Sequence, residues 1–246
     1  NTLLLSFTTL LTLFPLGVAI GTVQAVRHRT PLDTTLSVGS LVLFSMPEFW
    51  YAMLLQLFAA LLWSEWIRHL GEVGTLSETW VTLLELPATD MKDPISYEYM
   101  PFAEQMIDRF KHLILPGFGM ALASSAGVAR YMRSGMLEVI RQDFIRTARA
   151  KGLRERTVIL RHAMRNAMLP IITLIGLSVP ALFSGSVIIE TIFAWPGMGR
   201  EIVTAIYTQD TPVLIAMFYV FSLLVAAGNL IADISYAWAD PRIKMG

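Results

Sequence analysis

The sequence contains no cysteine and few charged residues. Without cysteine it has no disulfide framework, no thiolate metal site and no cysteine nucleophile, although this absence does not fix the redox compartment. Only 15% of the 246 residues are charged, whereas a soluble globular domain carries about 25%. The 19 lysines and arginines balance the 19 aspartates and glutamates, so no net positive field favours a nucleic-acid partner.

Apolar residues in long runs take the place of the missing charges. Hydrophobic residues make up 54% of the chain, and its mean hydropathy is +0.56. A helix needs roughly 17–25 mostly apolar residues to cross a membrane, and such long continuous runs exclude the alternating strands of a barrel. We therefore predict an all-α integral membrane protein. Its five expected spans cover about residues 2–26, 35–63, 112–131, 167–189 and 211–236.

Basic residues are distributed unevenly between the connections. Fourteen of the 19 lysines and arginines lie on one side, in 27–29, 130–165 and 242–244, and five lie on the other. The positive-inside rule makes the first side cytoplasmic, so we expect a cytoplasmic C-terminus. The sequence does not begin with Met, and a sixth helix upstream would return the N-terminus to the cytoplasm.

The inner connection, residues 132–166, is the more informative of the two long ones. Apolar residues recur at helical spacing up to Ala148, and Lys151-Gly152 is typical of a helix C-terminus. A second helix is expected from about 155 to 166. This pattern predicts a helix–Gly–helix hairpin too polar to enter lipid. From the residues alone, it fits either a partner-docking element or an amphipathic hairpin on anionic lipid.

The outer connection, residues 64–111, is acidic and rich in tryptophan and tyrosine near the span ends. Such residues are typical of the membrane interface. Three prolines in the connection, Pro87, Pro94 and Pro101, interrupt any long helix. It fits either a solvated interfacial loop or a docking surface for an extracytoplasmic partner.

Four sequence blocks, in order, resemble one family. They are FIRTARAKGL (144–153), ILRHAMRNAMLP (159–170), VIIETIFAWPGMG (187–199) and DISYAWADPRI (233–243), and residues 31–55 add a weaker match. Together they look like the dipeptide/oligopeptide branch of the ABC-importer permeases, of the first membrane-subunit type. The resemblance implies a six-helix type I importer fold in a bacterial-type inner membrane, with the family's first helix missing here.

The resemblance also implies a coupling helix marked by Ala148 and Gly152, which docks into a groove of a cytoplasmic ATPase. Arg146 stands where the general loop motif often has glutamate, as fits the peptide branch. Arg146, Arg149 and Lys151 are candidates to meet acidic groups of a partner. The residues expected at this contact are Arg146, Thr147, Ala148, Arg149, Ala150, Lys151, Gly152 and Leu153.

The implied partners are a second homologous permease, two cytoplasmic ABC ATPases and an extracytoplasmic substrate-binding protein. ATP and Mg are expected in the ATPase, because this chain has no Gly-x-x-x-x-Gly-Lys-Ser/Thr phosphate loop. We expect no catalytic residue, metal site or cofactor in the chain itself. Relatives in the branch carry peptides, nickel, glutathione or sugars, and a di- or oligopeptide is the expected substrate.

A few residues within the spans stand out. Glu48, beside Pro47, is an intramembrane carboxylate, and such residues are functional candidates because they are costly to bury in lipid. It fits either a pathway residue that meets a passing peptide or a carboxylate packed against the second permease. Gly119, Ala123 and Gly127 form a small-xxx-small ridge. A turn near the external gate is expected from Glu190, Pro196, Gly197 and Gly199.

Three other kinds of protein are alternatives to a permease. An intramembrane enzyme needs a nucleophile–base pair or a metal set, yet the four histidines lie at or beyond span ends. A proton-coupled secondary transporter using Glu48 is the stronger alternative, but it leaves the polar inner hairpin without a role. A structural membrane adaptor explains the hairpin but not the resemblance in the last two spans.

Overall fold

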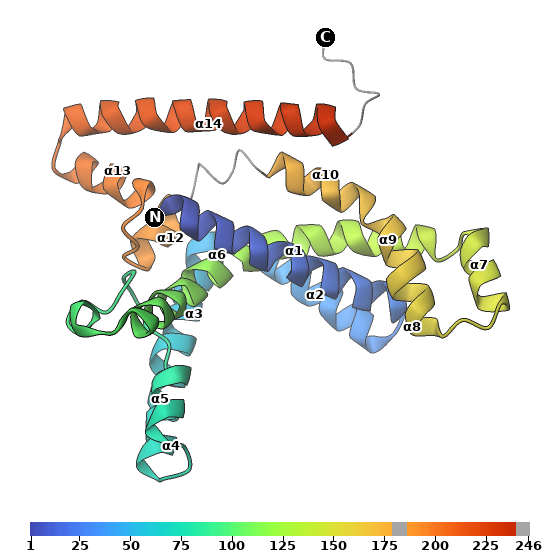
Figure 1. The fold of residues 1–246 in the computed structure, drawn as a ribbon, viewed down its shortest axis with the longest axis horizontal. Helices are drawn as coiled ribbons and strands as arrows, with labels where there is room; N and C mark the ends of the chain where they lie inside the picture. The colour runs from blue at the N-terminus through green and yellow to red at the C-terminus, as the bar shows by residue number, and fades with distance from the viewer. Residues whose placement is uncertain (179–185, 240–246) are drawn as a thin grey trace. The chain divides into compact units, whose positions relative to one another are not determined.

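The computed structural model describes residues 1–178 and 186–239, and of Ala60 and residues 231–239 only the backbone. Within these residues the regular structure is helical and no strand occurs (Figure 1). This confirms the all-α fold predicted from the sequence. Its physical basis is that backbone N–H and C=O groups in hydrocarbon must be satisfied within the segment, which a helix does.

Among the described residues, four helical segments are long and apolar enough to cross a membrane. They are 2–26, 48–72, 102–139 and 211–230. A fifth crossing results if Glu155–Ala167 and Leu169–Leu177, which meet at 47°, count as one broken span. Pro170, which lacks an N–H, lies in the first turn after this bend. Five spans are therefore consistent with the structure; residues 179–185 of the expected fourth span lie outside the described ones.

The expected second span, 35–63, is not one helix, which corrects the prediction. Helix α2 (Pro31–Ser45) ends before Met46, whose backbone is extended (ψ 139°), and α3 (Glu48–Leu55) begins after Pro47. Proline has no N–H to continue the helix, and its ring disfavours a helical residue before it. The chain then continues through the π-helix η1 (Gln56–Trp63) into α4 (Ser64–Glu72). Glu48 consequently lies at the start of a crossing helix, not in the middle of one.

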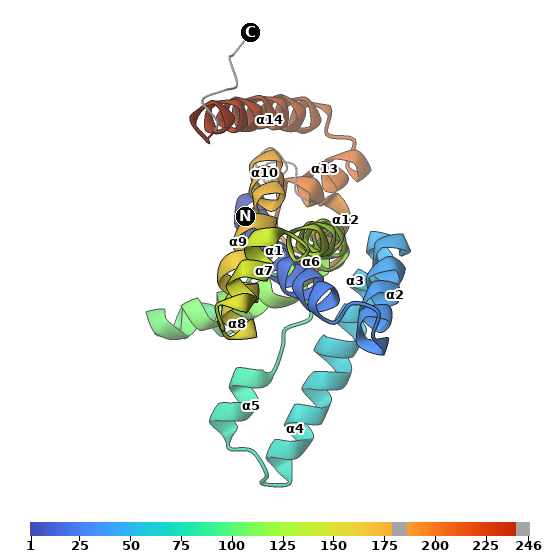
Figure 2. The same ribbon diagram turned by 90° about the vertical axis from the view of Figure 1, so that its right-hand side faces the viewer.

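The predicted outer connection, 64–111, is largely helical. Figure 2 shows α4 beside α5 (Glu78–Leu84). The Ser64 hydroxyl at the start of α4 donates to the carbonyl of Leu86, just after α5, and accepts the Leu86 N–H, each at 3.2 Å. A 3₁₀ turn, η2 (Tyr97–Tyr99), follows. Helix α6 (Phe102–Val139) then begins, and it extends beyond the expected third span, 112–131, at both ends.

The described residues fall into two compact units. Of the described residues, the first unit comprises 1–9, 47–120 and 186–225, so it contains the amino end of α1 (Thr2–Val26) and all of α12 (Val187–Ile192) and α13 (Met198–Tyr207). Large buried side chains such as Leu5, Phe193 and Trp195 form its core. This unit holds Glu48 and the predicted external turn.

The second unit comprises, of the described residues, 10–46, 121–178 and 226–239. It contains α2, the rest of α1, and the inner connection, which folds as α7 (Asp143–Ala150), α8 (Glu155–Thr157), the π-helix η3 (Val158–Ala163), α9 (Met164–Ala167) and α10 (Leu169–Leu177). Its core is built around Met132, Met136 and Ile145, which are all fully buried. The last helix, α14 (Thr211–Ala239), begins in the first unit and ends in the second.

Apolar side chains also cover much of the surface. In the most apolar stretch of α14 only 6% of the residues are buried, although its mean hydropathy is 2.2. Exposing this surface to water would be unfavourable, since each Å² of apolar area in contact with water costs about 25 cal/mol of free energy. Lipid or another membrane subunit must therefore cover it.

Candidate functional site

The inner connection folds into a hairpin at the end of α6, here called the inner hairpin (residues 143–167). Figure 1 shows α7 beyond the end of α6, with α8 and α9 returning beside it. Helix α7 ends at Ala150, and Gly152 follows with φ +73°. In this left-handed conformation Gly152 donates its N–H to the Arg149 carbonyl at 2.9 Å, and Leu153 reaches back to Ala148. The Lys151-Gly152 helix end predicted from the sequence is confirmed.

One face of the hairpin is buried in the second unit's core. Ile145 and Ala148 on α7 belong to the same buried cluster as Val158 and Ala163 on the returning helix and Met132 on α6. The spacing of these apolar residues explains this, because positions three and four apart lie on one helix face. Through this face α7 is packed against α6 and the returning helix.

Two of the three hairpin cations predicted to meet a partner already have partners within the hairpin. The Arg149 guanidinium donates to both oxygens of Glu155, at 2.7 and 3.1 Å, and this hydrogen bonding raises the pKa of Arg149. Arg146 pairs with Asp143 at 3.3 Å. In the described part of the chain only Lys151 among the three lacks such a pair. The Arg149–Glu155 pair bridges the turn at Gly152 and holds the two arms together.

The opposite face of α7 is open. Asp143, Arg146, Thr147 and Ala150 lie three or four residues apart and are all exposed. Two large apolar side chains, Phe144 in the first turn of α7 and Leu153 just after its end, are 43% and 41% exposed. An exposed apolar pair beside a polar stripe on a rigid hairpin is suited to a protein partner.

Helix α1 packs closely on α6, the helix that leads into the hairpin. The sequence reasoning missed this contact. A Cβ at Gly17 would lie 2.6 Å from the Val128 Cβ, and one at Gly21 would lie 2.8 Å from the Met132 Cβ. Only glycine allows the two backbones to approach this closely. The Gly17-x-x-x-Gly21 pattern in the first span was the available signal. Gly127 of the predicted ridge, by contrast, faces open space.

An ion pair with a buried carboxylate joins the first turn of α2 to the same part of α6, and the sequence reasoning missed it too. Asp33 is 4% exposed and accepts two hydrogen bonds from the Arg133 guanidinium, both at 3.0 Å. It also accepts the Arg29 backbone N–H at 3.0 Å and lies 3.3 Å from His28. The Arg133 hydrogen bonds hold the pKa of Asp33 well below its usual range. No local sequence pattern signals a pair one hundred residues apart.

The predicted external turn is a tightly packed corner in the first unit. The side chain of Glu190 on α12 is fully buried, and one carboxylate oxygen accepts the backbone N–H groups of Gly199 (2.7 Å) and Arg200 (3.2 Å) at the start of α13. The other accepts the Thr2 hydroxyl at 2.8 Å. A Cβ at Gly197 would overlap the carboxylate. The negative charge thus lies at a helix N-terminus, where the helix dipole favours it.

Trp195 and Pro196, between Glu190 and Gly197, form hydrogen bonds to Asn1 at the start of the chain. The Trp195 ring is fully buried, and its N–H donates to the Asn1 carbonyl at 3.3 Å. The Pro196 carbonyl accepts the Asn1 side-chain amide at 2.8 Å. Glu190, Pro196, Gly197 and Gly199, predicted together, are therefore brought together, while Thr2, which supplies the neutral donor, was not foreseen.

Glu48 lies in the same unit, in the first turn of α3. Its side chain is partly exposed, and one carboxylate oxygen accepts the Ser186 hydroxyl at 2.7 Å. Ser186 is also the N-cap of α12, accepting the Ile189 N–H. Pro47 precedes Glu48 and causes the break before α3. A partly exposed carboxylate on a broken helix is able to receive a cationic group.

Comparison with known proteins places these features in one family. Residues 15–245 match the binding-protein-dependent transport system inner membrane component family. The oligopeptide transport system permease protein AppB of Bacillus subtilis is 39% identical over 244 residues, which cover 99% of this chain and 69% of that protein.

Two further relatives are the di/tripeptide permease DppB of Pseudomonas aeruginosa and the dipeptide permease DppB of Escherichia coli. The first is 36% identical over 248 residues, covering 99% of this chain and 70% of that protein. The second is 34% identical over 234 residues, covering 93% and 66%. The chain therefore belongs to the family of inner-membrane components of binding-protein-dependent transport systems, as a multi-pass permease subunit.

Proposed function

We propose that this permease imports di- or oligopeptides as one of two homologous membrane subunits, driven by two cytoplasmic ABC ATPases and supplied by an extracytoplasmic binding protein. The inner hairpin carries the proposal: it is packed against α6, and its outward stripe is exposed. The peptide substrate is supported by the names of the similar permeases. ATP and Mg belong to the ATPase partners, and the C-terminus is cytoplasmic.

The coupling contact follows from this placement. The stripe of Arg146, Thr147 and Ala150 faces the ATPase, with Phe144 and Leu153 as apolar anchors, while the Arg149–Glu155 pair and Gly152 keep the turn in shape. Of the three cations predicted to meet a partner, Lys151 is the one without an ion pair among the described residues, and it would meet an acidic group of the ATPase. Closure of the ATPase pair then moves the hairpin, and through its buried face the membrane helices.

A steric variant tests the coupling contact. Ala150→Trp adds a large ring on the exposed stripe without entering the core, and Glu138→Trp adds the same ring at the exposed end of α6. In proteoliposomes containing the complete transporter, ATPase activity stimulated by binding protein should fall at least about tenfold in the first variant, since an interface does not absorb such a volume, and stay near wild type in the second.

A normal response from Ala150→Trp would exclude the coupling assignment. Uptake driven by a proton gradient without ATP, lost on Glu48→Gln, would then favour the secondary transporter. The substrate class is tested separately by supplying the binding protein with peptides, nickel, glutathione or a sugar; accumulation of any but peptides would exclude the peptide assignment while leaving the coupling assignment intact.

Glu48 and Pro47 are proposed to line the translocation pathway. The carboxylate would pair transiently with the amino group of a passing peptide, and the corner at Glu190, Pro196, Gly197 and Gly199 would form part of the external gate. Glu48→Gln should slow import of a peptide with a free amino group more than import of its N-acetylated form. Equal slowing of both would exclude the charge pairing.

A further inference from the structure

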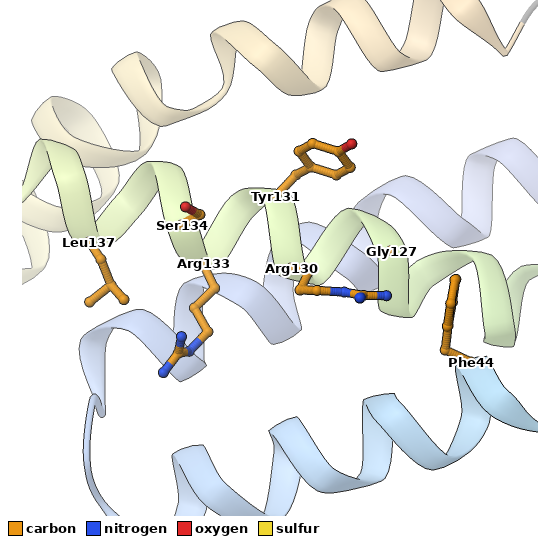
Figure 3. A pocket seen from close by; sticks show the side chains of 7 residues that line it. All are labelled: Phe44, Gly127, Arg130, Tyr131, Arg133, Ser134 and Leu137. Atoms are coloured by element: carbon orange, nitrogen blue, oxygen red, sulfur yellow. The ribbon is translucent and has the colours of Figure 1, made fainter.

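A groove beside α2 and α6 in the second unit has no role in the function proposed above. Its volume is about 630 Å³, and Phe44 of α2 and Gly127, Arg130 and Ser134 of α6 line it (Figure 3). A second cavity of about 230 Å³, lined by Leu41 and several polar side chains, reaches the same arginine. Arg130 therefore lies where the two cavities meet.

One positive charge in the groove has no ion-pair partner among the residues that the structure describes. Arg133, at its edge, is neutralised by the two 3.0 Å hydrogen bonds to Asp33. Arg130 instead lies with its guanidinium 4.6 Å from the centre of the Phe44 ring, and in the described part of the chain it forms no ion pair. Figure 3 shows this difference: Arg133 points to the α1–α2 connection, whereas Arg130 lies along the groove toward Phe44.

The position of Arg130 along α6 corresponds to the membrane surface. It is the first charge after the charge-free stretch 113–129, and Lys111 lies nineteen residues before it. At 1.5 Å per residue these two charges are about 29 Å apart, close to the thickness of the hydrocarbon core. Exposed apolar side chains of α2, Leu41 and Phe44, line the cavities, whereas Ser134 lies one turn beyond Arg130, away from the hydrocarbon core.

We propose that this groove binds an anionic phospholipid. The Arg130 guanidinium holds the phosphate, and one acyl chain lies over Phe44 and Leu41. The groove has a charged group near the membrane surface and apolar side chains on the hydrocarbon side, which match the head group and the acyl chains of a lipid. Basic pockets between membrane helices bind anionic head groups. Tyr131, 58% exposed beside them, has the amphipathic character typical of this depth. In the orientation proposed above the lipid belongs to the cytoplasmic leaflet.

Two variants separate charge from shape. Arg130→Gln removes the charge, and Gly127→Leu fills the groove, since a Cβ there meets nothing within 4 Å. Arg141→Gln, an exposed arginine outside the groove, is the control. Binding of phosphatidylglycerol and of phosphatidylcholine with the same acyl chains is measured by native mass spectrometry on the full-length permease in complex with its partner subunits. Glycerol 3-phosphate is added as a head group without chains.

We expect tighter binding of phosphatidylglycerol than of phosphatidylcholine by wild type. Arg130→Gln should weaken phosphatidylglycerol binding about fivefold, as expected for one interfacial cation, and Gly127→Leu should weaken both lipids. The control should match wild type, and millimolar glycerol 3-phosphate should not displace the lipid.

Four results would overturn the proposal. Unchanged lipid binding in both groove variants would place the lipid elsewhere, and displacement by glycerol 3-phosphate would indicate a site for free phosphate. Loss of the second permease from Gly127→Leu, with lipid binding unaltered, would make the groove a subunit interface. Displacement by a transported peptide would place it in the translocation pathway.

Discussion

The corner around Glu190 and the inner hairpin each hold a turn between two helices, but the corner uses a buried charge and the hairpin uses exposed ion pairs. In the corner a single carboxylate is completely buried and is held by a hydroxyl and two backbone N–H groups. In the hairpin two ion pairs cross the surface, with side chains such as Arg149 and Glu155 exposed by 39% and 57%.

The two turns differ in the free energy that is lost when one of their interacting groups is removed. A buried charge without its donors costs several kcal/mol, because no water replaces them, so the corner is rigid only as a complete set. An exposed pair gains about 0–1 kcal/mol and water replaces either partner. The corner is therefore built to stay fixed, whereas the hairpin surface is able to exchange internal partners for those of another subunit.

The largest expected effect is at the corner. Glu190→Ala should lower the free energy of unfolding of the full-length chain by roughly 3–5 kcal/mol, because it leaves a cavity and removes the acceptor for three donors. Glu190→Gln should cost about half as much, since its carbonyl still accepts the two α13 amides. Unfolding in mixed micelles measures both, with exposed Glu201→Ala as the control. If Glu190→Ala were as stable as this control, the corner would not be an interdependent set.

Next is the Asp33–Arg133 pair in the second unit, of which the carboxylate is buried. Asp33→Asn should cost about 2 kcal/mol, because it leaves Arg133 without its counter-charge. A double-mutant cycle with Arg133→Gln tests whether the loss comes from this contact. A double mutant whose loss equals the sum of the two single losses would show that the pair contributes no coupling.

The same pair predicts a pH dependence of definite sign. Since pairing lowers the pKa of Asp33, its contribution is complete above the unfolded value of about 3.9 and is lost as the pH falls toward the lower folded value. In a His28→Gln background, the stability lost on Asp33→Asn should stay constant from about pH 8 to 5 and shrink below about pH 4. A loss that already shrinks near pH 6 would contradict the assignment.

A smaller effect is expected where α1 meets α6. Gly17→Ala places a Cβ 2.7 Å from the Ser125 carbonyl oxygen and should cost about 1–3 kcal/mol through overpacking. Gly39→Ala on α2 meets nothing within 4 Å and should be neutral or slightly stabilising, as alanine favours helix. Equal stability of the two variants would mean that the close helix approach does not form.

The smallest effect on stability belongs to the hairpin surface. Arg149→Gln should change the free energy of unfolding by no more than about 1 kcal/mol, because the pair with Glu155 is exposed. Under the proposed function it should nevertheless reduce ATPase stimulation by the binding protein, since the turn at Gly152 loses a brace. A loss of several kcal/mol would instead assign this pair to the structural core.

Local patterns predicted the hairpin well and the second span poorly. Lys151-Gly152 marks a helix end because the left-handed conformation at Gly152 is a local property. Pro47 lies within the expected span, but hydropathy is an average over a window and does not show where a helix breaks. The expected 35–63 span therefore hid the boundary between α2 and α3.

Contacts between distant segments were beyond local patterns. The sequence alone determined that this chain is helical, spans a membrane several times and carries a polar hairpin with the signature of a permease family, because hydropathy, charge and turn residues act over short ranges. Only the tertiary structure decided that Asp33 pairs with Arg133, that Thr2 completes the Glu190 corner, and that Arg130 lies over Phe44 without an ion pair among the described residues. Whether a charge is satisfied depends on which distant residue folding brings beside it.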